Sequence, residues 1–397
     1  MTAFHYGYGH PLQATPTRWE WLPRYPLCKT ARPLAILLLT SEVPPYFRGG
    51  LGRHVDRLAR YLISRGHLVH VLSPYPADDA LPYPVSSLDL FMQSLPHNPE
   101  HQTIVHVHDT GLWHQGKILA NALHSPLLIT WHTLYASWAH HLSLIPEAQT
   151  AAFERMVLGA CRHHIWVSQF LLTEARALYQ YHSQYTHDWV IGSGVSFPQI
   201  DVSGAVKGFP DLLYFGRLEP EKGIDWIFTA LSGLISRNRH FQAVLCGTGS
   251  MQEQIRSLIQ MEGWTNNVYA PGLVGDGELA RYLSTASLAV LPSRFEPFGL
   301  TALESMASGM ATIVGPAAGY REFAQPGLNC FQARDPIELT DMVQYLLSHA
   351  DRRRELGHAG AQLSSEWNWH QIGQKIEDVY YRILATEDPV ATCEDKL

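Results

Sequence analysis

The segment ASLAVLPSRFEPFGLTALESMA, residues 286–307, places a strand, a polar loop and a helix in direct succession. The apolar run Leu288–Leu291 has the length of a buried strand, and Gly299 precedes a stretch of helical character. Two carboxylates belong to this unit: Glu296 in the loop and Glu304, eight residues later, in the predicted helix. A strand followed by a loop and a helix is the building block of a parallel α/β sheet.

The same strand-then-helix pattern recurs on both sides of this segment. A stretch of Gly, Pro and Ser with little apolar period, residues 197–210, separates the repeats into two groups and has the composition of a linker. The pattern predicts an α/β protein of two Rossmann-like domains that face each other across a cleft. The predicted strands are Leu34–Leu39, Leu68–Leu72, Ile104–Val107, Leu127–Thr130 and His164–Val167, then Leu212–Phe215, Phe241–Leu245, Asn267–Ala270, Leu288–Leu291 and Thr312–Val314.

These patterns divide the 397 residues into four parts. Residues 1–33 are rich in Pro, Tyr, Trp and His and are expected to form an N-terminal extension. Residues 34–200 are expected to form the first domain and residues 201–368 the second. Residues 369–397 begin with a helix, for which a return to the first domain is one option.

Composition and charge narrow the class of protein. The net charge of -7 argues against a nucleic-acid partner, and the five scattered cysteines argue against both a disulfide framework and a zinc site. Because no secretory signal or membrane-spanning run is visible, we expect a cytoplasmic protein. Arginines between residues 48 and 65 leave contact with an anionic membrane surface open, although a solvated helix face is favoured.

A first candidate binding motif, RGGLG at residues 48–52, lies between the first predicted strand and a helix over Val55–Ser64. Glycines at Gly49 and Gly50 would let the backbone approach a ligand, and the helix N-terminus offers N–H groups to phosphate. A tight turn without a ligand is the alternative.

A second motif, GRLEPEKG at residues 216–223, also joins a strand to a helix. The Arg217 fork and the Lys222 point charge can together neutralise a leaving diphosphate. The order of residues is not that of a Walker loop, which excludes an ATP-hydrolysing P-loop. The alternative is a surface ion pair with Glu219 or Glu221.

The carboxylates Glu296 and Glu304 suit hydroxyl groups rather than bare phosphate, because carboxylates accept hydrogen bonds. One can therefore serve a sugar and the other a ribose. For Glu304, the alternative is a solvated helix residue.

Together these motifs resemble glycosyltransferase family 4, whose signature places two glutamates eight residues apart and whose phosphate-binding pair has the spacing of Arg217 and Lys222. The resemblance covers nearly all of the chain after residue 33. Further strings resemble the glycogen and starch synthases, which share the GT-B fold: SEV at 41–43, GGLG at 49–52, HVHD at 106–109, TWHT at 130–133 and PSRFEPFG at 292–299.

The resemblance implies that residues 34–200 form the acceptor-side domain and that residues 201–368 bind the nucleotide sugar. It also implies a role for each candidate residue. His132 would contact the sugar near its 6-hydroxyl, and Glu296 its 3- and 4-hydroxyls. Asp109 would lie on the acceptor side, although Thr110 replaces the usual Trp of the family. The catalytic set is thus His132, Glu296, Arg217 and Lys222, and the donor-binding set is Gly49, Gly50, Arg217, Lys222, Phe298, Gly299, Leu300 and Glu304.

The chain has 22 histidines, which makes chance pairs common. His106 and His108 should share a strand face, but no Asp, Glu or Cys in the sequence completes a ligand shell. We therefore expect no metal and no cofactor.

The expected activity is retaining transfer of a hexose-type sugar from a nucleotide-diphosphate sugar to an unidentified acceptor hydroxyl on a saccharide, lipid or small molecule. Three alternatives stay open: glycogen synthase-like glucan elongation, NDP-sugar 2-epimerisation, and non-catalytic sugar-nucleotide binding.

Overall fold

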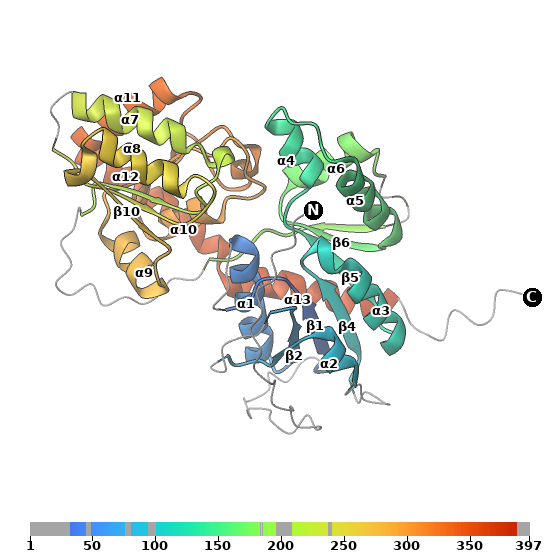
Figure 1. The fold of residues 1–397 in the computed structure, drawn as a ribbon. Coiled ribbons are helices and arrows are strands. Elements are labelled where there is room, and N and C mark those ends of the chain that lie inside the picture. Colours follow the sequence, from blue (N-terminus) through green and yellow to red (C-terminus); the bar gives the residue numbers. More distant parts are fainter. Residues whose placement is uncertain are drawn as a thin grey trace, which may run out of the picture.

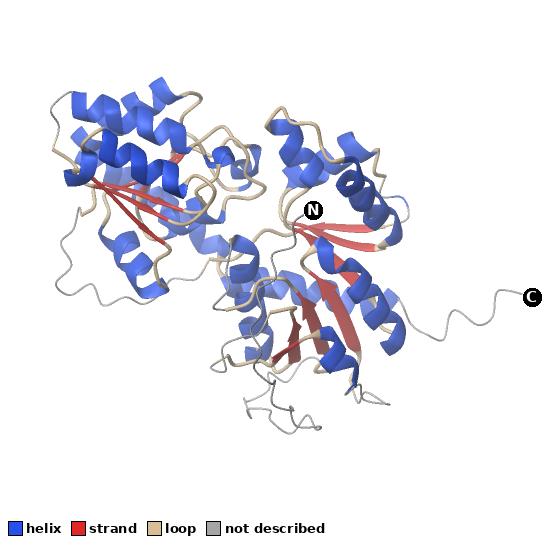
Figure 2. Ribbon diagram, viewed as in Figure 1, coloured by secondary structure: helices blue, strands red, loops and turns tan. Residues whose placement is uncertain are grey.

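The computed structural model describes residues 32–44, 49–75, 81–93, 101–182, 184, 186–195, 209–236 and 240–386. Nearly all of the predicted N-terminal extension, Arg48, most of the predicted linker and the last residues of the chain lie outside the described residues. The described chain forms two α/β domains, each built on one parallel sheet flanked by helices (Figures 1 and 2).

The first sheet has seven strands in the order β3-β2-β1-β4-β5-β6-β7. Apolar side chains alternate along its central strand: Ile36 and Leu38 belong to one core, and Leu37 and Leu39 to another. Both faces of the sheet are therefore buried, as expected for parallel strands. The strands are β1 (Ala35–Leu39), β2 (Leu68–Leu72), β3 (Val85–Ser86), β4 (Thr103–Val107), β5 (Leu127–Trp131), β6 (His163–Trp166) and β7 (His187–Val190); the helices are α1 (Gly50–Ser64), α2 (Leu88–Gln93), α3 (Trp113–Leu123), α4 (Tyr135–His141), α5 (Ala148–Ala160) and α6 (Gln169–Tyr179).

The second sheet has six parallel strands in the order β10-β9-β8-β11-β12-β13. Its strands are β8 (Leu212–Phe215), β9 (Ala243–Cys246), β10 (Val268–Gly272), β11 (Leu288–Leu291), β12 (Ala311–Val314) and β13 (Phe331–Gln332), and its helices are α7 (Ile224–Ser236), α8 (Gln252–Met261), α9 (Asp276–Thr285), α10 (Leu300–Ala307), α11 (Pro336–Ser348) and α12 (Ala350–Ser364).

Both sheets have a topological switch point, where the strand order reverses: between β1 and β4 in the first domain and between β8 and β11 in the second. Open α/β sheets bind ligands in the crevice outside the carboxyl ends of the strands at such a point. The topology alone therefore predicts one ligand-binding crevice in each domain.

The two-domain Rossmann-like prediction is confirmed, and each predicted strand is present with ends that differ by at most two residues. The sequence analysis missed β3, β7 and β13. Two of these have only two residues, and β7 (HDWV) has no buried residue, so none offers the apolar run that identified the others.

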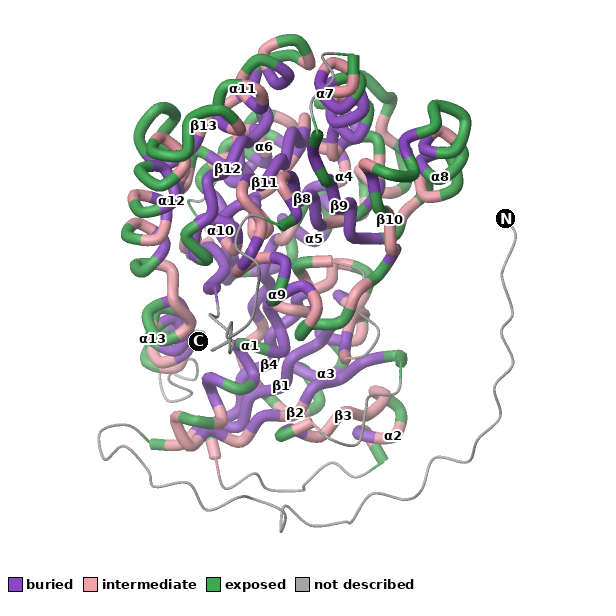
Figure 3. The backbone as a smooth tube through the Cα atoms, turned by 90° about the vertical axis from the view of Figure 1, so that its left-hand side faces the viewer, coloured by how far each residue is buried: buried purple, intermediate pink, exposed green. Residues whose placement is uncertain are grey.

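The last helix, α13 (Trp369–Thr386), lies beside α1 of the first domain (Figure 1). Its buried residues Ile372, Ile376 and Tyr380 join the core that includes Ile36 and Leu38. In Figure 3, buried stretches of α1 and α13 lie near the buried strands β1 and β4. Among the described residues, no helix has the length and apolar character needed to cross a membrane.

Candidate active site

The candidate residues follow strands at or beside the two switch points. In the first domain, Gly49 precedes α1 and Gly50 is its first residue, Asp109 follows β4, and His132 follows β5. In the second domain, Arg217 follows β8 and Glu296 follows β11. Residues far apart in the sequence are therefore held at the carboxyl edges of both sheets.

The glycine turn of the first domain touches the second domain. A Cβ atom on Gly50 would lie 3.5 Å from Leu300 Cδ2, and one on Gly49 would lie 3.9 Å from Arg217 Cδ. The N–H groups of Gly49 and Gly52 each donate a hydrogen bond of 3.1 Å to Glu42 Oε2. A carboxylate of the chain itself therefore occupies two of the N–H groups expected to approach a ligand.

Both cations of the predicted phosphate pair are held by carboxylates. Arg217 Nη2 donates to Glu221 Oε1 at 2.9 Å, and Lys222 Nζ donates to Glu296 Oε2 at 2.7 Å. The Arg217 side chain is 46% exposed, which makes its ion pair accessible to a ligand, whereas Lys222 and Glu296 are mostly buried. The ion pair with Glu221 that the sequence left open is present, but Lys222 instead links the two candidate loops of the second domain.

Two glycines allow close packing around these loops. Gly223 has φ +70°, and a Cβ atom there would lie 2.2 Å from the Pro292 carbonyl oxygen, so no larger residue fits. Gly299 has φ +103°, and a Cβ atom would lie 2.5 Å from the ring of Tyr320. The side chain of Phe298 is buried against Trp367, with ring centroids 5.3 Å apart. This loop can therefore offer a ligand its backbone more readily than the Phe298 ring.

Glu304 is not a solvated helix residue, because its side chain is only 18% exposed. Arg53 Nη1, from α1 of the first domain, approaches Glu304 Oε1 at 3.4 Å. Burial raises the pKa of Glu304, and the Arg53 guanidinium opposes this shift. Glu304 Oε2 is buried and accepts no hydrogen bond from the described residues, so one oxygen is free to accept a hydroxyl.

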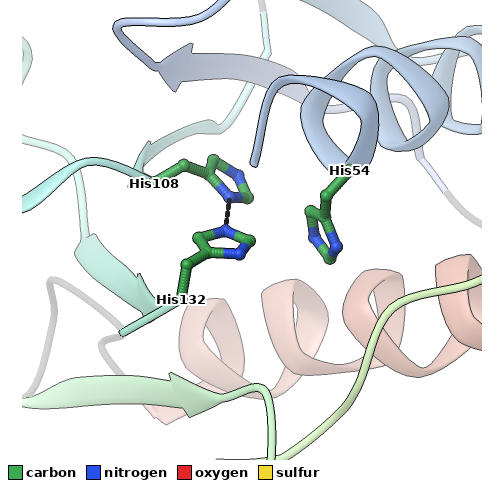
Figure 4. Close-up of side chains that lie close together, drawn as sticks. All are labelled: His54, His108 and His132. Carbon is green, nitrogen blue, oxygen red and sulfur yellow. Dashed lines mark hydrogen bonds between the residues drawn. The ribbon is translucent and has the colours of Figure 1, made fainter. Parts of the chain in front are cut away.

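His132 and Asp109 make their contacts within the first domain. His132 Nε2 lies 3.2 Å from His108 Nδ1, and the ring of His54 packs edge-on to His132 with centroids 4.8 Å apart (Figure 4). Burial lowers the pKa of His132 to about 4, although Asp109 opposes the shift, and lowers the pKa values of His54 and His108 well below 6.5. All three rings are therefore neutral at neutral pH. Asp109 itself accepts hydrogen bonds from the Ser41 hydroxyl and, at 2.9 Å, from the Gly111 N–H.

Two facing Rossmann-like domains, with cations after β8 and carboxylates after β11, form the architecture of a GT-B glycosyltransferase. Comparison with protein families agrees. Residues 48–195 match the model described as Glycosyltransferase Family 4, and residues 197–363 match Glycosyl transferases group 1. The chain belongs to glycosyltransferase family 4, and it is a transferase.

One relative in sequence and two solved structures illustrate the similarity. A glycogen synthase of Mycobacterium tuberculosis is 26% identical over 395 residues, which cover 87% of this chain and 94% of that protein. Sucrose-phosphate synthase from Thermosynechococcus elongatus has a TM-score of 0.71 at 20% identity, over 89% of this chain and 100% of that chain. HepE from Anabaena, in complex with UDP and glucose, has a TM-score of 0.68 at 18% identity, over 87% of this chain and 99% of that chain.

Proposed function

We propose that this glycosyltransferase moves a hexose from a nucleotide-diphosphate sugar to an acceptor hydroxyl, with retention of anomeric configuration and without a metal ion. One observation carries the proposal. The glycine turn of the first switch point lies against Arg217 and Leu300 at the second, so the two crevices form one site. HepE, which shares the fold, was solved with UDP and glucose, and this supports a nucleotide-sugar donor.

The diphosphate of the donor would take the place of two carboxylates. Arg217 and Lys222 now face Glu221 and Glu296, and a diphosphate, which carries two negative charges, can accept hydrogen bonds from the same N–H groups. Release of Glu296 from Lys222 would leave its carboxylate free for the sugar hydroxyls. The site would thus exchange an internal ion pair for two ligand contacts.

The remaining contacts would fix the nucleoside and the sugar. Glu304 would accept hydrogen bonds from the ribose through its free oxygen, and the backbone amides of Phe298 and Gly299 would support Glu296 at the sugar. Closure of the cleft would bring His132 to the sugar from the first domain. Asp109 would face the acceptor.

In the reaction, the bond between the anomeric carbon and the diphosphate oxygen breaks and an oxocarbenium-like centre forms. The acceptor hydroxyl attacks from the same face and loses its proton to an oxygen of the leaving β-phosphate. The electron pair of the broken bond leaves with the diphosphate, whose charge Arg217 and Lys222 stabilise. The protein supplies charge and position rather than a dedicated base.

A thermal-shift panel of UDP-, GDP- and ADP-sugars tests this proposal. A donor present at 100 times its dissociation constant adds about 2.7 kcal/mol to the free energy of unfolding. We expect one nucleotide series to stabilise the protein, and that donor then enters an acceptor screen. If every series leaves the melting temperature unchanged, the proposal is wrong. Isomerisation of the free donor without an acceptor would establish the epimerase alternative instead.

A further inference from the structure

Three histidine rings from separate elements meet at the carboxyl edge of the first sheet. His54 comes from the first turns of α1, His108 follows β4, and His132 follows β5 (Figure 4). Each offers one ring nitrogen, and these three atoms all lie within 4.8 Å of one another. The sequence suggested no such group, because 54 residues separate His54 from His108 and only the fold brings them together.

The spacing suits a tetrahedral metal ion. Two imidazole nitrogens bound to one zinc at about 2.0–2.1 Å lie about 3.3–3.4 Å apart. His108 Nδ1 and His132 Nε2 lie 3.2 Å apart. A modest shift of the His54 ring would complete a three-histidine shell and leave a fourth position for water or another ligand.

The hydrogen bonds around the rings also fit a ligand set. His54 Nδ1 is bonded to Ser193 Oγ at 3.0 Å, which fixes the ring and leaves Nε2 as its free nitrogen. Metal-binding histidines are commonly held in this way through the second ring nitrogen. The Nε2 atom of His54 is buried and has no hydrogen-bond partner among the described residues, which is costly unless something binds there.

The surroundings supply access and charge. His54 and His108 are buried, whereas His132 is partly exposed and gives an ion a route from the cleft. Asp109 directly follows His108 in the chain and interacts electrostatically with His132. The ring of Trp369 packs edge-on against His54, with centroids 5.1 Å apart, and provides an apolar wall.

We propose that His54, His108 and His132 form a binding site for a first-row transition metal ion, with zinc as the preferred occupant, and that a bound ion excludes the sugar donor. Imidazole nitrogen suits zinc, and three histidines with one open position form a known type of zinc shell. The exclusion rests on the proposed function, because it requires His132 to contact the sugar. Transfer itself needs no metal, so the ion acts as an inhibitor.

Equilibrium dialysis of the metal-stripped full chain against Zn²⁺ tests the site. We expect one zinc per chain, and we expect His54→Asn to weaken its binding by at least about 100-fold, since loss of an outer-shell partner alone costs about 10–100-fold. The asparagine amide can still reach Ser193, which preserves the local packing. His70→Gln is the matched control, because His70 also pairs with a serine hydroxyl, Ser86 Oγ at 2.8 Å, away from the three rings. Equal zinc binding by both variants would overturn the site.

Co²⁺ absorption provides a readout on the unaltered protein, in case His54→Asn fails to fold. The site predicts the intense visible bands of tetrahedral Co²⁺, displaced by one equivalent of Zn²⁺. Weak bands typical of octahedral Co²⁺ would mean that only surface histidines bind the ion, and the site would be refuted.

The exclusion is tested by repeating the thermal-shift panel with and without one equivalent of Zn²⁺. We expect zinc to abolish the shift that the donor causes in wild type and to leave that shift intact in His54→Asn. An additive shift from zinc and donor would refute the exclusion. A metal-free protein that binds no donor would refute the proposed function and the exclusion with it, whereas the dialysis result would still stand.

Discussion

Arg53 Nη1 in the first domain and Glu304 Oε1 in the second form an ion pair at 3.4 Å across the domain boundary. The pair uses one oxygen of a carboxylate whose other oxygen is buried and free. In the proposed complex, that free oxygen would serve the ribose. The same side chain would thus respond both to the approach of the first domain and to the nucleotide.

Replacement of Arg53 by Gln should destabilise the protein. Glu304 would keep its buried position without its cation, so we expect the free energy of unfolding in urea to fall by about 1–3 kcal/mol. Arg256→Gln in α8 is the control, because Arg256 is 47% exposed and its partner at 3.1 Å, Glu253, is 84% exposed. A loss no larger in Arg53→Gln than in the control would show that the link between the domains contributes nothing.

Lys222→Ala should lower kcat by about 10²–10³-fold, the usual effect of removing one preorganised stabilising group. The variant should still fold, but with a lower melting temperature, because the mostly buried Glu296 loses its cation; kcat is therefore measured well below that temperature. The exposed Lys117 of α3 provides the control variant Lys117→Ala. Initial rates with the donor found in the panel measure the effect. Near-normal turnover in Lys222→Ala would contradict its role at the diphosphate.

The substitution Glu377→Gln should change how stability depends on pH. Burial acts to raise the pKa of the Glu377 carboxyl, but hydrogen bonds from His67 and Tyr61 outweigh it and lower this pKa below its ordinary value. A lowered carboxyl pKa stabilises the fold above the unfolded value of about 4.3, and this stability is lost as the pH falls through the folded pKa.

We therefore expect Glu377→Gln to be less stable than wild type at pH 7 and the difference to shrink as the pH falls below about 4.3. Urea unfolding at a series of pH values measures the difference. The exposed Glu366 gives the control variant Glu366→Gln. A difference that stays constant down to pH 3 would contradict the linkage.

Gly373→Ala should loosen the last helix. A Cβ atom at Gly373 would lie 2.3 Å from the Tyr61 ring, so α13 and α1 would have to separate, at a cost of about 1–3 kcal/mol in unfolding free energy. In α5, a Cβ atom on Gly159 would meet nothing within 4 Å, and Gly159→Ala should be neutral or slightly stabilising. Similar unfolding midpoints for the two variants would contradict this packing.

The sequence predicted the fold well where the chain is buried on both sides. Leu288–Leu291 is both the predicted and the observed strand, because an uninterrupted apolar run of this length is typical of a parallel strand that is buried on both faces. By contrast, His187–Val190 forms an edge strand that has no buried residue and is held by backbone hydrogen bonds. Such pairing leaves little trace in the residue pattern.

The sequence identified site residues that lie close together along the chain better than those that only the fold brings together. Arg217 and Lys222 were found because they share one loop. By contrast, Glu42 appeared only within the SEV string and Arg53 only within an arginine cluster, and His54 was not singled out. Arg53 and His54 do follow the glycine turn directly, so their position at the start of α1 was a usable signal. What each of them contacts depends on the arrangement of the two domains, which a local pattern does not contain.

The return of α13 to the first domain has a consequence for synthesis. Ile372, Ile376 and Tyr380 complete a core whose other members begin at Leu34. A ribosome makes the chain from its N-terminus, and domains generally fold in that order. Here the core of the first domain is incomplete until α13 has been synthesised, and by then the whole second domain has emerged. The second domain can therefore complete its folding before the first.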